Sequence, residues 1–183
     1  MSPSSEQLSK RLAFVLRHDP GSIGLDLDPG GWVDLDSLVA ALRAYGVHVD
    51  RAEIERLVSR AGASSRYEID GNRIRAAQGH SVPIDLGLEP QPPPRLLYHG
   101  TVARFLDDIR AAGLRRGRRT HVHLSPDVAA AQRVGRRRGA PVVLVIDAGR
   151  MHEDGHAFLR AANGVWLVEA VPPTYIDVDS DAG

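Results

Sequence analysis

The residues best suited to chemistry are an arginine and a histidine in sequence, Arg17-His18, followed closely by Pro20. A proline disfavours helical backbone at the residue before it, so a helix that carries this pair must end there. The helix dipole favours cations at a helix C-terminus, which by itself would explain the pair. Arginine also binds phosphate oxygens through two parallel hydrogen bonds, and histidine exchanges protons near neutral pH. The pair could therefore be structural or could form half of a phosphate-handling site.

Two further stretches carry polar side chains beside predicted strands. Gln78-Gly79-His80-Ser81 comes after a predicted β-hairpin, and His99-Gly100-Thr101 comes directly after a short predicted strand. A glycine lets the backbone approach a ligand closely, and the flanking histidine and threonine could contact a nucleotide. Ordinary loop chemistry would explain either stretch equally well, because so few residues make a motif of low specificity.

The fourth candidate is the stretch from Arg119 to Ser125, in which His121 and His123 alternate along a predicted strand, and Arg119 also ends a basic run, residues 115–119. A run of like charge is usually a solvated loop. The alternative is a phosphate-binding site, which requires the side chain of Arg119 to lie close to those of Arg17 and Arg66. Three converging guanidinium groups would bind a dianionic phosphate and stabilise charge that develops on it. The sequence alone leaves both interpretations open.

Several kinds of site are disfavoured by what the chain lacks. It contains no cysteine, which excludes disulfides, thiolate zinc sites and a cysteine nucleophile. His121 and His123 would share one face of a strand, but no carboxylate stands at a ligand spacing from them, so we expect no metal site. A Gly-x-Ser-x-Gly elbow is missing, and Ser125, with Pro126 after it, is predicted to cap a helix. The glycine-rich loops of Rossmann and P-loop proteins are missing as well.

The composition is that of an ordinary globular protein. The 183 residues include 23 basic and 23 acidic side chains, give a formal net charge of zero and are 43% hydrophobic. This length suits one domain or two small ones, and zero net charge argues against a general nucleic-acid coat protein. There is no apolar run of membrane-spanning length and no signal-peptide pattern. We therefore expect a cytoplasmic protein with no membrane contact and no obligate protein partner.

The first half of the chain has the element order of a winged helix-turn-helix: three helices and then a hairpin. Its helix and hairpin signals follow the rules for caps, stops and tight turns. They are Pro20 as a stop, Asp34 as an N-cap, Gly46 as a stop, Asp50 with Glu53 as a capping box, Gly62 as a stop, and strands 66–69 and 73–76 around Asp70-Gly71-Asn72.

A proline-rich stretch, residues 88–94, is the clearest boundary in the chain and predicts an extended linker. Residues 1–87 would then form one lobe and residues 95–183 another. In the second lobe, short apolar strands interleave with helices, which predicts an α+β fold. The predicted elements are strands 96–98, 122–124, 142–146 and 165–168, a helix from about Val102 to Gly113, and a helix from Ser125-Pro126 to about Gly135.

Taken together, these motifs resemble one family, the NAD-dependent RNA 2′-phosphotransferases, which remove a splice-junction 2′-phosphate from tRNA. The match runs in order from about Leu8 to Trp166. Each stretch alone is weak, but the ordered set is specific. The matching stretches are residues 14–18, Arg66-Tyr67, 74–76 with 78–81, 97–101, 122–125, Val134-Gly135 and 163–167.

The resemblance implies an N-terminal winged-helix lobe and a C-terminal ADP-ribosyltransferase-like lobe, with the active site between them. It also implies a catalytic set, which falls on Arg17, His18, Arg66 and Arg119 of this chain, with Arg118 as the neighbouring alternative to Arg119. The implied NAD⁺ contacts are Gln78, His80, Tyr98, His99, Gly100, Thr101, His123, Ser125 and Arg137.

The implied reaction has two steps and needs no metal. The 2′-phosphate of a tRNA-like RNA displaces nicotinamide from NAD⁺, and the ribose 2″-hydroxyl then takes the phosphate as ADP-ribose 1″,2″-cyclic phosphate. The chain departs from the family in one place. Residues 136–139 read Arg-Arg-Arg-Gly where the family tends to have Ala-Arg-His-Gly, so Arg138 replaces a histidine. The effect on local NAD⁺ or RNA contacts is left open.

Two other functions compete with this one. An ADP-ribosyltransferase acting on a nucleic-acid 5′-phosphate or another acceptor would share the NAD⁺ site and lack the second step. A winged-helix DNA-binding regulator would use the helix 50–61 for recognition, but Glu53 and Glu55 among its arginines make a poor major-groove surface.

Overall fold

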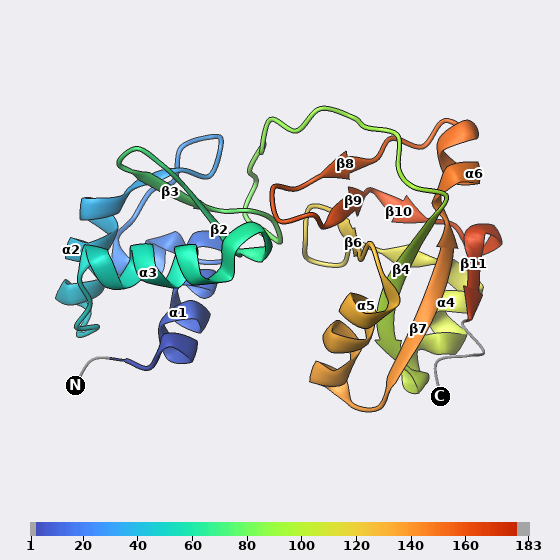
Figure 1. Ribbon diagram of the computed structural model, residues 1–183, viewed down its shortest axis with the longest axis horizontal. Coiled ribbons are helices and arrows are strands. Elements are labelled where there is room, and N and C mark those ends of the chain that lie inside the picture. Colours follow the sequence, from blue (N-terminus) through green and yellow to red (C-terminus); the bar gives the residue numbers. More distant parts are fainter. Residues whose placement is uncertain (1–2, 179–183) are drawn as a thin grey trace. The chain divides into compact units, whose positions relative to one another are not determined.

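A computed structural model describes residues 3–178 and shows an α+β protein (Figure 1). Contacts divide the chain into two compact units, one ending at Gly87 and the other beginning at Leu88. Each unit contains its own helices, its own sheets and its own hydrophobic core. The α+β class predicted from the sequence is confirmed.

Residues 3–87 of the N-terminal unit form three α-helices, two short 3₁₀ helices and one small sheet. These elements are α1 Ser5–Arg17, η1 Pro20–Ile23, β1 Val33–Asp34, α2 Leu35–Ala44, α3 Arg51–Ala61, η2 Gly62–Ser64, β2 Tyr67–Asp70 and β3 Arg73–Ala76.

The ends of the three helices are set by capping residues close to them in the sequence. The Asp34 side chain accepts a hydrogen bond from the Ser37 backbone at the start of α2. Asp50 and Glu53 form the predicted capping box at the start of α3. Helix α1 ends at Arg17, before Pro20, and His18 is its C-cap. These caps satisfy backbone groups that a helix end leaves without partners, so the predicted boundaries are confirmed.

The three strands form an antiparallel sheet in the order β1-β3-β2. Ile74 of β3 faces Val33 on one side and Ile69 on the other. Asp70 pairs with Arg73, so the hairpin turn consists of Gly71 and Asn72. The apolar sides of the helices pack against this sheet. The core between them contains Leu12, Leu16, Leu35, Leu38, Leu42, Ile54 and Ile74.

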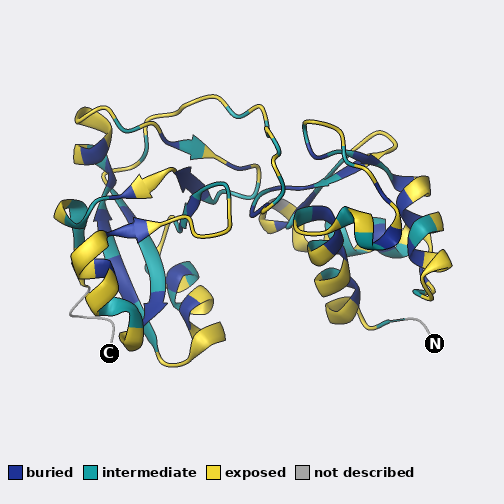
Figure 2. Ribbon diagram, turned by 180° about the vertical axis from the view of Figure 1, so that it is seen from behind, coloured by how far each residue is buried: buried dark blue, intermediate teal, exposed yellow. Residues whose placement is uncertain are grey.

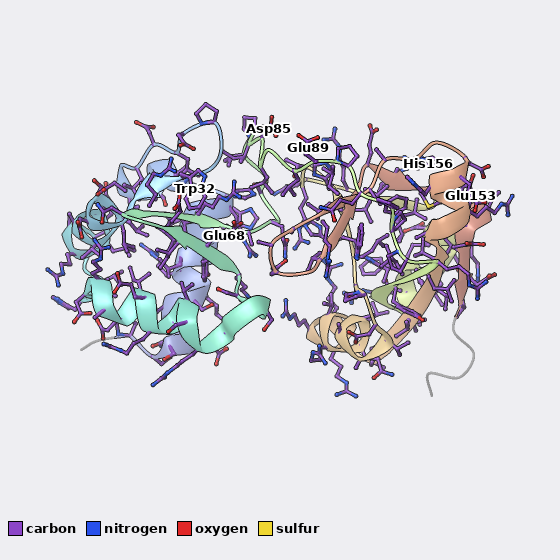
Figure 3. The ribbon with its side chains drawn as sticks, turned by 45° about the horizontal axis from the view of Figure 1, so that its top comes forward. Trp32, Glu68, Asp85, Glu89, Glu153 and His156 are labelled. Atoms are coloured by element: carbon purple, nitrogen blue, oxygen red, sulfur yellow. The ribbon has the colours of Figure 1, made fainter. Side chains whose placement is uncertain are left out.

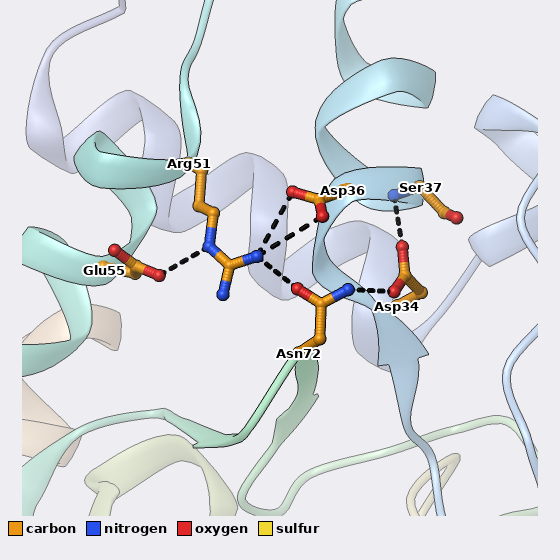
Figure 4. Close-up of polar contacts among 6 residues, drawn as sticks. All are labelled: Asp34, Asp36, Ser37, Arg51, Glu55 and Asn72. Carbon is orange, nitrogen blue, oxygen red and sulfur yellow. Dashed lines mark hydrogen bonds and ion pairs between the residues drawn. The ribbon is translucent and has the colours of Figure 1, made fainter.

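A polar network fastens the hairpin turn to the helices (Figure 4). Arg51 of α3 donates to Glu55 at 2.7 Å, to Asp36 of α2 at 3.3 Å, and to Asn72. Asn72 in turn donates to Asp34, the N-cap of α2. One turn residue thus ties the starts of two helices together, which fixes the hairpin against them.

A second polar group lies on the sheet of this unit, where Figure 3 labels Trp32 and Glu68. The Arg75 guanidinium stacks 4.5 Å from the Trp32 ring centroid and forms an ion pair with Glu68 at 3.1 Å. It also donates to the carbonyls of Gly30 and Leu86. Arg75 is therefore fully engaged in holding the sheet, the loop before β1 and the end of the unit.

The C-terminal unit is built from shorter elements. They are β4 Leu96–Val102, η3 Ala103–Phe105, α4 Leu106–Ala112, β5 Leu114–Arg115, β6 Val122–Leu124, α5 Val128–Gly135, η4 Arg136–Arg138, β7 Pro141–Asp147, α6 Ala148–Glu153, β8 Leu159–Arg160, β9 Trp166–Val168, β10 Ala170–Val171, η5 Pro173–Tyr175 and β11 Ile176–Val178.

Two three-stranded sheets, β11-β7-β4 and β6-β9-β8, form the framework of this unit, with β5 and β10 as a separate pair. Backbone hydrogen bonds between Tyr98 and Ser125 join β4 to the chain just after β6. Figure 2 shows the buried residues concentrated on the inner faces of the strands and helices. The core contains Leu97, Leu124, Leu144, Ile146, Met151, Phe158 and Trp166.

Strand β4 is longer than predicted, and this changes two assignments. His99-Gly100-Thr101 lies inside β4 and pairs with residues 142–144 of β7, whereas the sequence placed it after a strand. The helix predicted from Val102 begins at Leu106, because Val102 still pairs with Pro141. The pairing with a long apolar strand overrides the turn signal of the glycine.

The predicted cap of α5 was also wrong. Asp127 is the N-cap, and its side chain accepts from the Ala130 backbone at 2.7 Å. Ser125 instead exchanges backbone hydrogen bonds with Tyr98. A serine and an aspartate two residues apart both suit an N-cap, and the strand pairing of Ser125 decides between them.

The proline-rich stretch 88–94, predicted as a linker, belongs to the C-terminal unit and is attached to it. Pro90 forms an isolated bridge with Leu159, and the Gln91 backbone donates to the Phe158 carbonyl at 2.8 Å. Within residues 3–178, none of the helices has the length and apolar character needed to cross a membrane.

Candidate functional site

The first cluster of predicted site residues lies at the end of α1. Arg17 is half-buried, and its Nη2 donates to the Arg66 carbonyl at 3.4 Å. The same carbonyl accepts from the Ala77 backbone at 2.9 Å, just after β3. The chain entering the hairpin and the chain leaving it are therefore fastened together beside the Arg17 guanidinium. Arg17, His18 and Arg66, three of the four predicted catalytic residues, belong to this unit.

The loop after β3 closes over the end of α1. The Arg17 carbonyl accepts from the Ser81 backbone at 2.8 Å, and Nδ1 of His18 lies 2.9 Å from the Ser81 hydroxyl. Gly79 has φ +90°, and a Cβ at that position would lie 3.5 Å from Nη1 of Arg17. The loop backbone therefore runs directly against the guanidinium.

His80 anchors this loop in the interior. It is 1% exposed, and its Nε2 makes no hydrogen bond within the described residues. Burial, helped by the positive charges of Arg17, Arg75 and His18, lowers its pKa to about 4. His80 is therefore neutral near pH 7 and adds no charge to the cluster. The predicted NAD⁺ contact Gln78 is half-buried two residues earlier.

The second cluster lies in the C-terminal unit, around His99 of β4. Nδ1 of His99 donates to the His123 carbonyl at 2.9 Å, because a carbonyl can only accept. Burial lowers the pKa of His99, and Arg138 and Arg119 lower it further. A neutral ring with its proton on Nδ1 offers Nε2 as an acceptor, which suits a ligand hydroxyl.

Arg119 belongs to the same cluster. Its Nη1 donates to Nδ1 of His123 at 3.2 Å. Partial burial lowers the pKa of Arg119, and the charges of Arg138 and Arg137 lower it further. Arg119, Arg137 and Arg138 are thus close enough for their charges to act on one another, and their combined positive potential would attract a phosphate. Arg118 is exposed, as Arg119 is, so the contact with His123 is what distinguishes Arg119.

A cavity of about 480 Å³ opens beside β4. Its volume falls in the range of small-molecule sites, and its walls combine apolar side chains with a few polar ones. The guanidinium groups of Arg104 and Arg138 lie 4.9 and 5.9 Å from the Phe105 ring centroid. The lining residues are His99, Thr101, Phe105, Asp108, Ile109, Ala111, Ala112, Gly113, Leu114, Arg115 and Arg138.

The structure places Gly100 differently from the sequence-based interpretation. A Cβ at Gly100 would lie 1.8 Å from the Ala131 carbonyl oxygen and 2.9 Å from the Gly135 nitrogen. The close approach that this glycine permits is thus between β4 and α5, and not toward a nucleotide. Gly135 of α5 permits the same close approach from the other side, since a Cβ at this position would lie 2.9 Å from the Thr101 carbonyl oxygen.

The predicted site residues therefore form two groups. Arg17, His18, Arg66, Gln78 and His80 lie in the N-terminal unit, whereas Tyr98, His99, Gly100, Thr101, Arg119, His123, Ser125 and Arg137 lie in the other.

Sequence reasoning missed most of the cavity wall. Phe105, Asp108 and Ile109 lay in a predicted helix with no sign of a binding role, and Leu114 carried no signal. Within residues 3–178, no three histidine or carboxylate side chains lie together in a way that could hold a metal ion.

Comparison with known proteins shows the family to which the chain belongs. A sequence model described as RNA 2′-phosphotransferase, Tpt1/KptA family, matches residues 3–170. The chain belongs to this family. It is 53% identical over 170 residues to a "Probable RNA 2′-phosphotransferase" of Streptomyces coelicolor, covering 93% of each chain. It is 50% identical over 179 residues to one of Burkholderia lata, covering 96% of this chain and 91% of the relative.

The contacts of helix α3 agree with membership of the RNA 2′-phosphotransferase family and disfavour the DNA-binding alternative. A DNA-reading helix needs its arginines available to base edges and phosphates. Arg51 is instead held by two carboxylates and Asn72 (Figure 4). The helix thus serves to hold the hairpin, and the DNA-binding alternative loses one of its basic residues.

Proposed function

We propose that this protein removes an internal 2′-phosphate from RNA by transferring it to NAD⁺. The products would be RNA with a 2′-hydroxyl, nicotinamide and ADP-ribose 1″,2″-cyclic phosphate. The observation that carries the proposal is the family match over residues 3–170, which spans both units of the chain. The two polar clusters supply side chains with the chemistry this reaction needs.

The proposal gives each unit a fold and a task. The N-terminal unit would be a winged-helix lobe that binds RNA, which its three helices and hairpin support. The C-terminal unit would be an ADP-ribosyltransferase-like lobe that binds NAD⁺, which its two small sheets and its cavity support. The reaction requires side chains from both.

In the first step, an oxygen of the RNA 2′-phosphate forms a bond to the anomeric carbon of the nicotinamide riboside. The carbon–nitrogen bond breaks and nicotinamide leaves. The nucleophile is already anionic, so the protein must hold it in line more than activate it. Arg17, Arg66 and Arg119 would hold its oxygens, since guanidinium groups suit phosphate geometry.

In the second step, the ribose 2″-hydroxyl oxygen forms a bond to phosphorus and loses its proton. The bond from phosphorus to the RNA 2′-oxygen breaks, and that oxygen takes up a proton. Negative charge spreads over the phosphoryl oxygens, where the arginines would stabilise it. His18 would orient the phosphoryl group or move a proton. No step of this scheme calls for a metal.

The size and lining of the C-terminal cavity support the proposal that it binds part of NAD⁺. Phe105, Ile109 and Leu114 offer an apolar surface for a flat ring, and His99 offers Nε2 as an acceptor for a ribose hydroxyl. The guanidinium of Arg138 stands at the same cavity and suits a phosphate. In this scheme Tyr98, Thr101, His123, Ser125 and Arg137 would complete the contacts, together with Gln78 of the other unit. His80, which is 1% exposed, would support the loop that carries Gln78 instead of touching NAD⁺.

The proposal is tested by incubating the protein with NAD⁺ and a short RNA that carries one internal 2′-phosphate, and analysing products by mass spectrometry. Formation of 2′-hydroxyl RNA and ADP-ribose cyclic phosphate in equal amounts is the expected result. A matched RNA without the 2′-phosphate is the control and should release no nicotinamide.

Two other outcomes would change the assignment. If nicotinamide is not released from NAD⁺ in the presence of the 2′-phosphate RNA, both transferase functions are wrong. If the nucleic acid becomes stably ADP-ribosylated and keeps its phosphate, the protein is an ADP-ribosyltransferase that lacks the second step. A 5′-phosphorylated RNA tested in parallel identifies the acceptor in that case.

A further inference from the structure

The loop 79–82 holds the end of α1 through two kinds of contact. Backbone groups of Ser81 and Val82 donate to the Arg17 carbonyl, at 2.8 and 3.4 Å. This carbonyl belongs to the last turn of α1, where helix carbonyls have no partner within the helix. The backbone contacts are thus a cap, and they do not depend on which side chain stands at position 81.

The Ser81 side chain makes a different contact. Its hydroxyl lies 2.9 Å from Nδ1 of His18 and 3.5 Å from the Arg17 carbonyl oxygen. A hydroxyl has one proton, and a carbonyl can only accept. Both contacts are satisfied together only if the hydroxyl donates to Arg17 and accepts from Nδ1–H of His18. This arrangement places the His18 proton on Nδ1.

We infer that Ser81 is a positioning residue for His18: its hydroxyl engages Nδ1 and so makes Nε2 the ring nitrogen that acts on the substrate. The hydrogen bond at one imidazole nitrogen sets the tautomer and therefore the role of the other. The inference deepens the proposed function and rests on it only for the claim that His18 acts on substrate.

Neighbouring contacts keep this loop in one place. His80, 1% exposed, buries the middle of the loop. Gly79 adopts φ +90°, which a residue with a side chain rarely does, and lies against the Arg17 guanidinium. The loop therefore orients Arg17 through its backbone and His18 through the Ser81 hydroxyl.

The test separates the hydroxyl from the backbone cap. Ser81→Ala keeps the backbone donor and removes the hydroxyl, whereas Ser81→Thr keeps both. Ser59→Ala is the matched control, because Ser59 is another exposed serine of this unit whose hydroxyl contacts a backbone carbonyl, that of Arg56 at 3.2 Å. All are made in the full chain.

The first readout needs no activity. Long-range ¹H–¹⁵N spectra of the free protein report which ring nitrogen of His18 carries the proton, with His18→Gln used to assign the signal. We expect the proton on Nδ1 in wild type, Ser81→Thr and Ser59→Ala, and its redistribution toward Nε2 in Ser81→Ala. A wild-type His18 protonated on Nε2, or no change in Ser81→Ala, would overturn the inference.

The second readout is the pH dependence of kcat for 2′-phosphate transfer. Ser81→Ala should lower kcat about tenfold with KM for NAD⁺ unchanged, and should displace the limb of the pH profile that reports His18. Ser81→Thr should restore both. If wild type is inactive, the proposed function fails while the spectra still decide the role of Ser81. If wild type is active and Ser81→Ala matches it, the function stands and the inference fails.

Discussion

Nη1 of Arg119 lies 3.2 Å from Nδ1 of His123, and the guanidinium donates a hydrogen bond to that nitrogen. The backbone carbonyl of the same histidine accepts a hydrogen bond from His99. His123 thus links the predicted phosphate-binding arginine to the histidine beside the cavity. This contact favours Arg119 over Arg118 as the fourth arginine of the proposed site.

Replacing Arg119 should affect turnover far more than replacing its neighbour. Arg119→Ala removes a charge that the proposal places on the phosphate, and loss of one such donor typically costs about 10²–10³ in kcat. Arg118→Ala should stay within about threefold of wild type, because the proposal gives this arginine no contact with the phosphate. Initial rates of 2′-phosphate transfer check both. A larger loss in Arg118→Ala would reverse the assignment.

His99 should contribute to binding of NAD⁺ more than to binding of RNA. His99→Asn retains a donor for the His123 carbonyl and removes the acceptor Nε2. We expect KM for NAD⁺ to rise about tenfold, the worth of one hydrogen bond to a ligand, with KM for RNA little changed. His152→Ala, at an exposed histidine of α6, is the control. Equal effects on both KM values would argue against a cofactor role.

His80 should make the N-terminal unit less stable in mild acid. Burial lowers its pKa to about 4 in the folded state, against 6.5 in the unfolded chain. As pH falls below 6.5, His80 becomes protonated in the unfolded chain but stays neutral in the folded protein. The free energy of unfolding therefore decreases between pH 6.5 and 4. The difference between 6.5 and about 4, at about 1.4 kcal/mol per pKa unit, corresponds to roughly 3 kcal/mol.

Urea denaturation monitored at several pH values measures this loss. His80→Gln should have lower stability at pH 7 and a flatter dependence on pH between 6.5 and 4. His48→Gln, at an exposed histidine of the same unit, should keep the wild-type dependence. If His80→Gln loses stability in acid as steeply as wild type, the buried neutral imidazole is not the cause.

Gly100 should tolerate no side chain. The Cβ of Gly100→Ala would lie 1.8 Å from the Ala131 carbonyl oxygen, so β4 and α5 would have to move apart, at a cost of about 3 kcal/mol or more. Gly117→Ala is the contrasting variant. Its φ is +62° with open space around it, so only backbone strain of about 1 kcal/mol is expected. Thermal unfolding of the two variants should differ clearly, and equal losses would contradict the packing argument.

The sequence predicted the N-terminal helices well because their boundaries are set by local chemistry. Asp34, Asp50 with Glu53, and Gly62 each act on backbone groups within a few residues, and the structure confirms each one. The hairpin was predicted for the same reason, since its turn is decided by Gly71 and Asn72.

The C-terminal unit was predicted less well because distant pairings decide its local structure. His99-Gly100-Thr101 lies in a strand because it pairs with β7, more than 40 residues later in the chain. Ser125 loses its cap role because it pairs with Tyr98. The cavity could not be foreseen either, since Phe105, Asp108 and Leu114 gain a shared surface only through tertiary packing.

The central claim is that the RNA 2′-phosphate itself moves to the NAD⁺-derived product. It is tested most directly with an RNA whose single internal 2′-phosphate carries ³²P, incubated with the protein and NAD⁺. The account predicts that the label leaves the RNA and appears in ADP-ribose cyclic phosphate. Label recovered as inorganic phosphate, or retained on the RNA while nicotinamide is released, would contradict it.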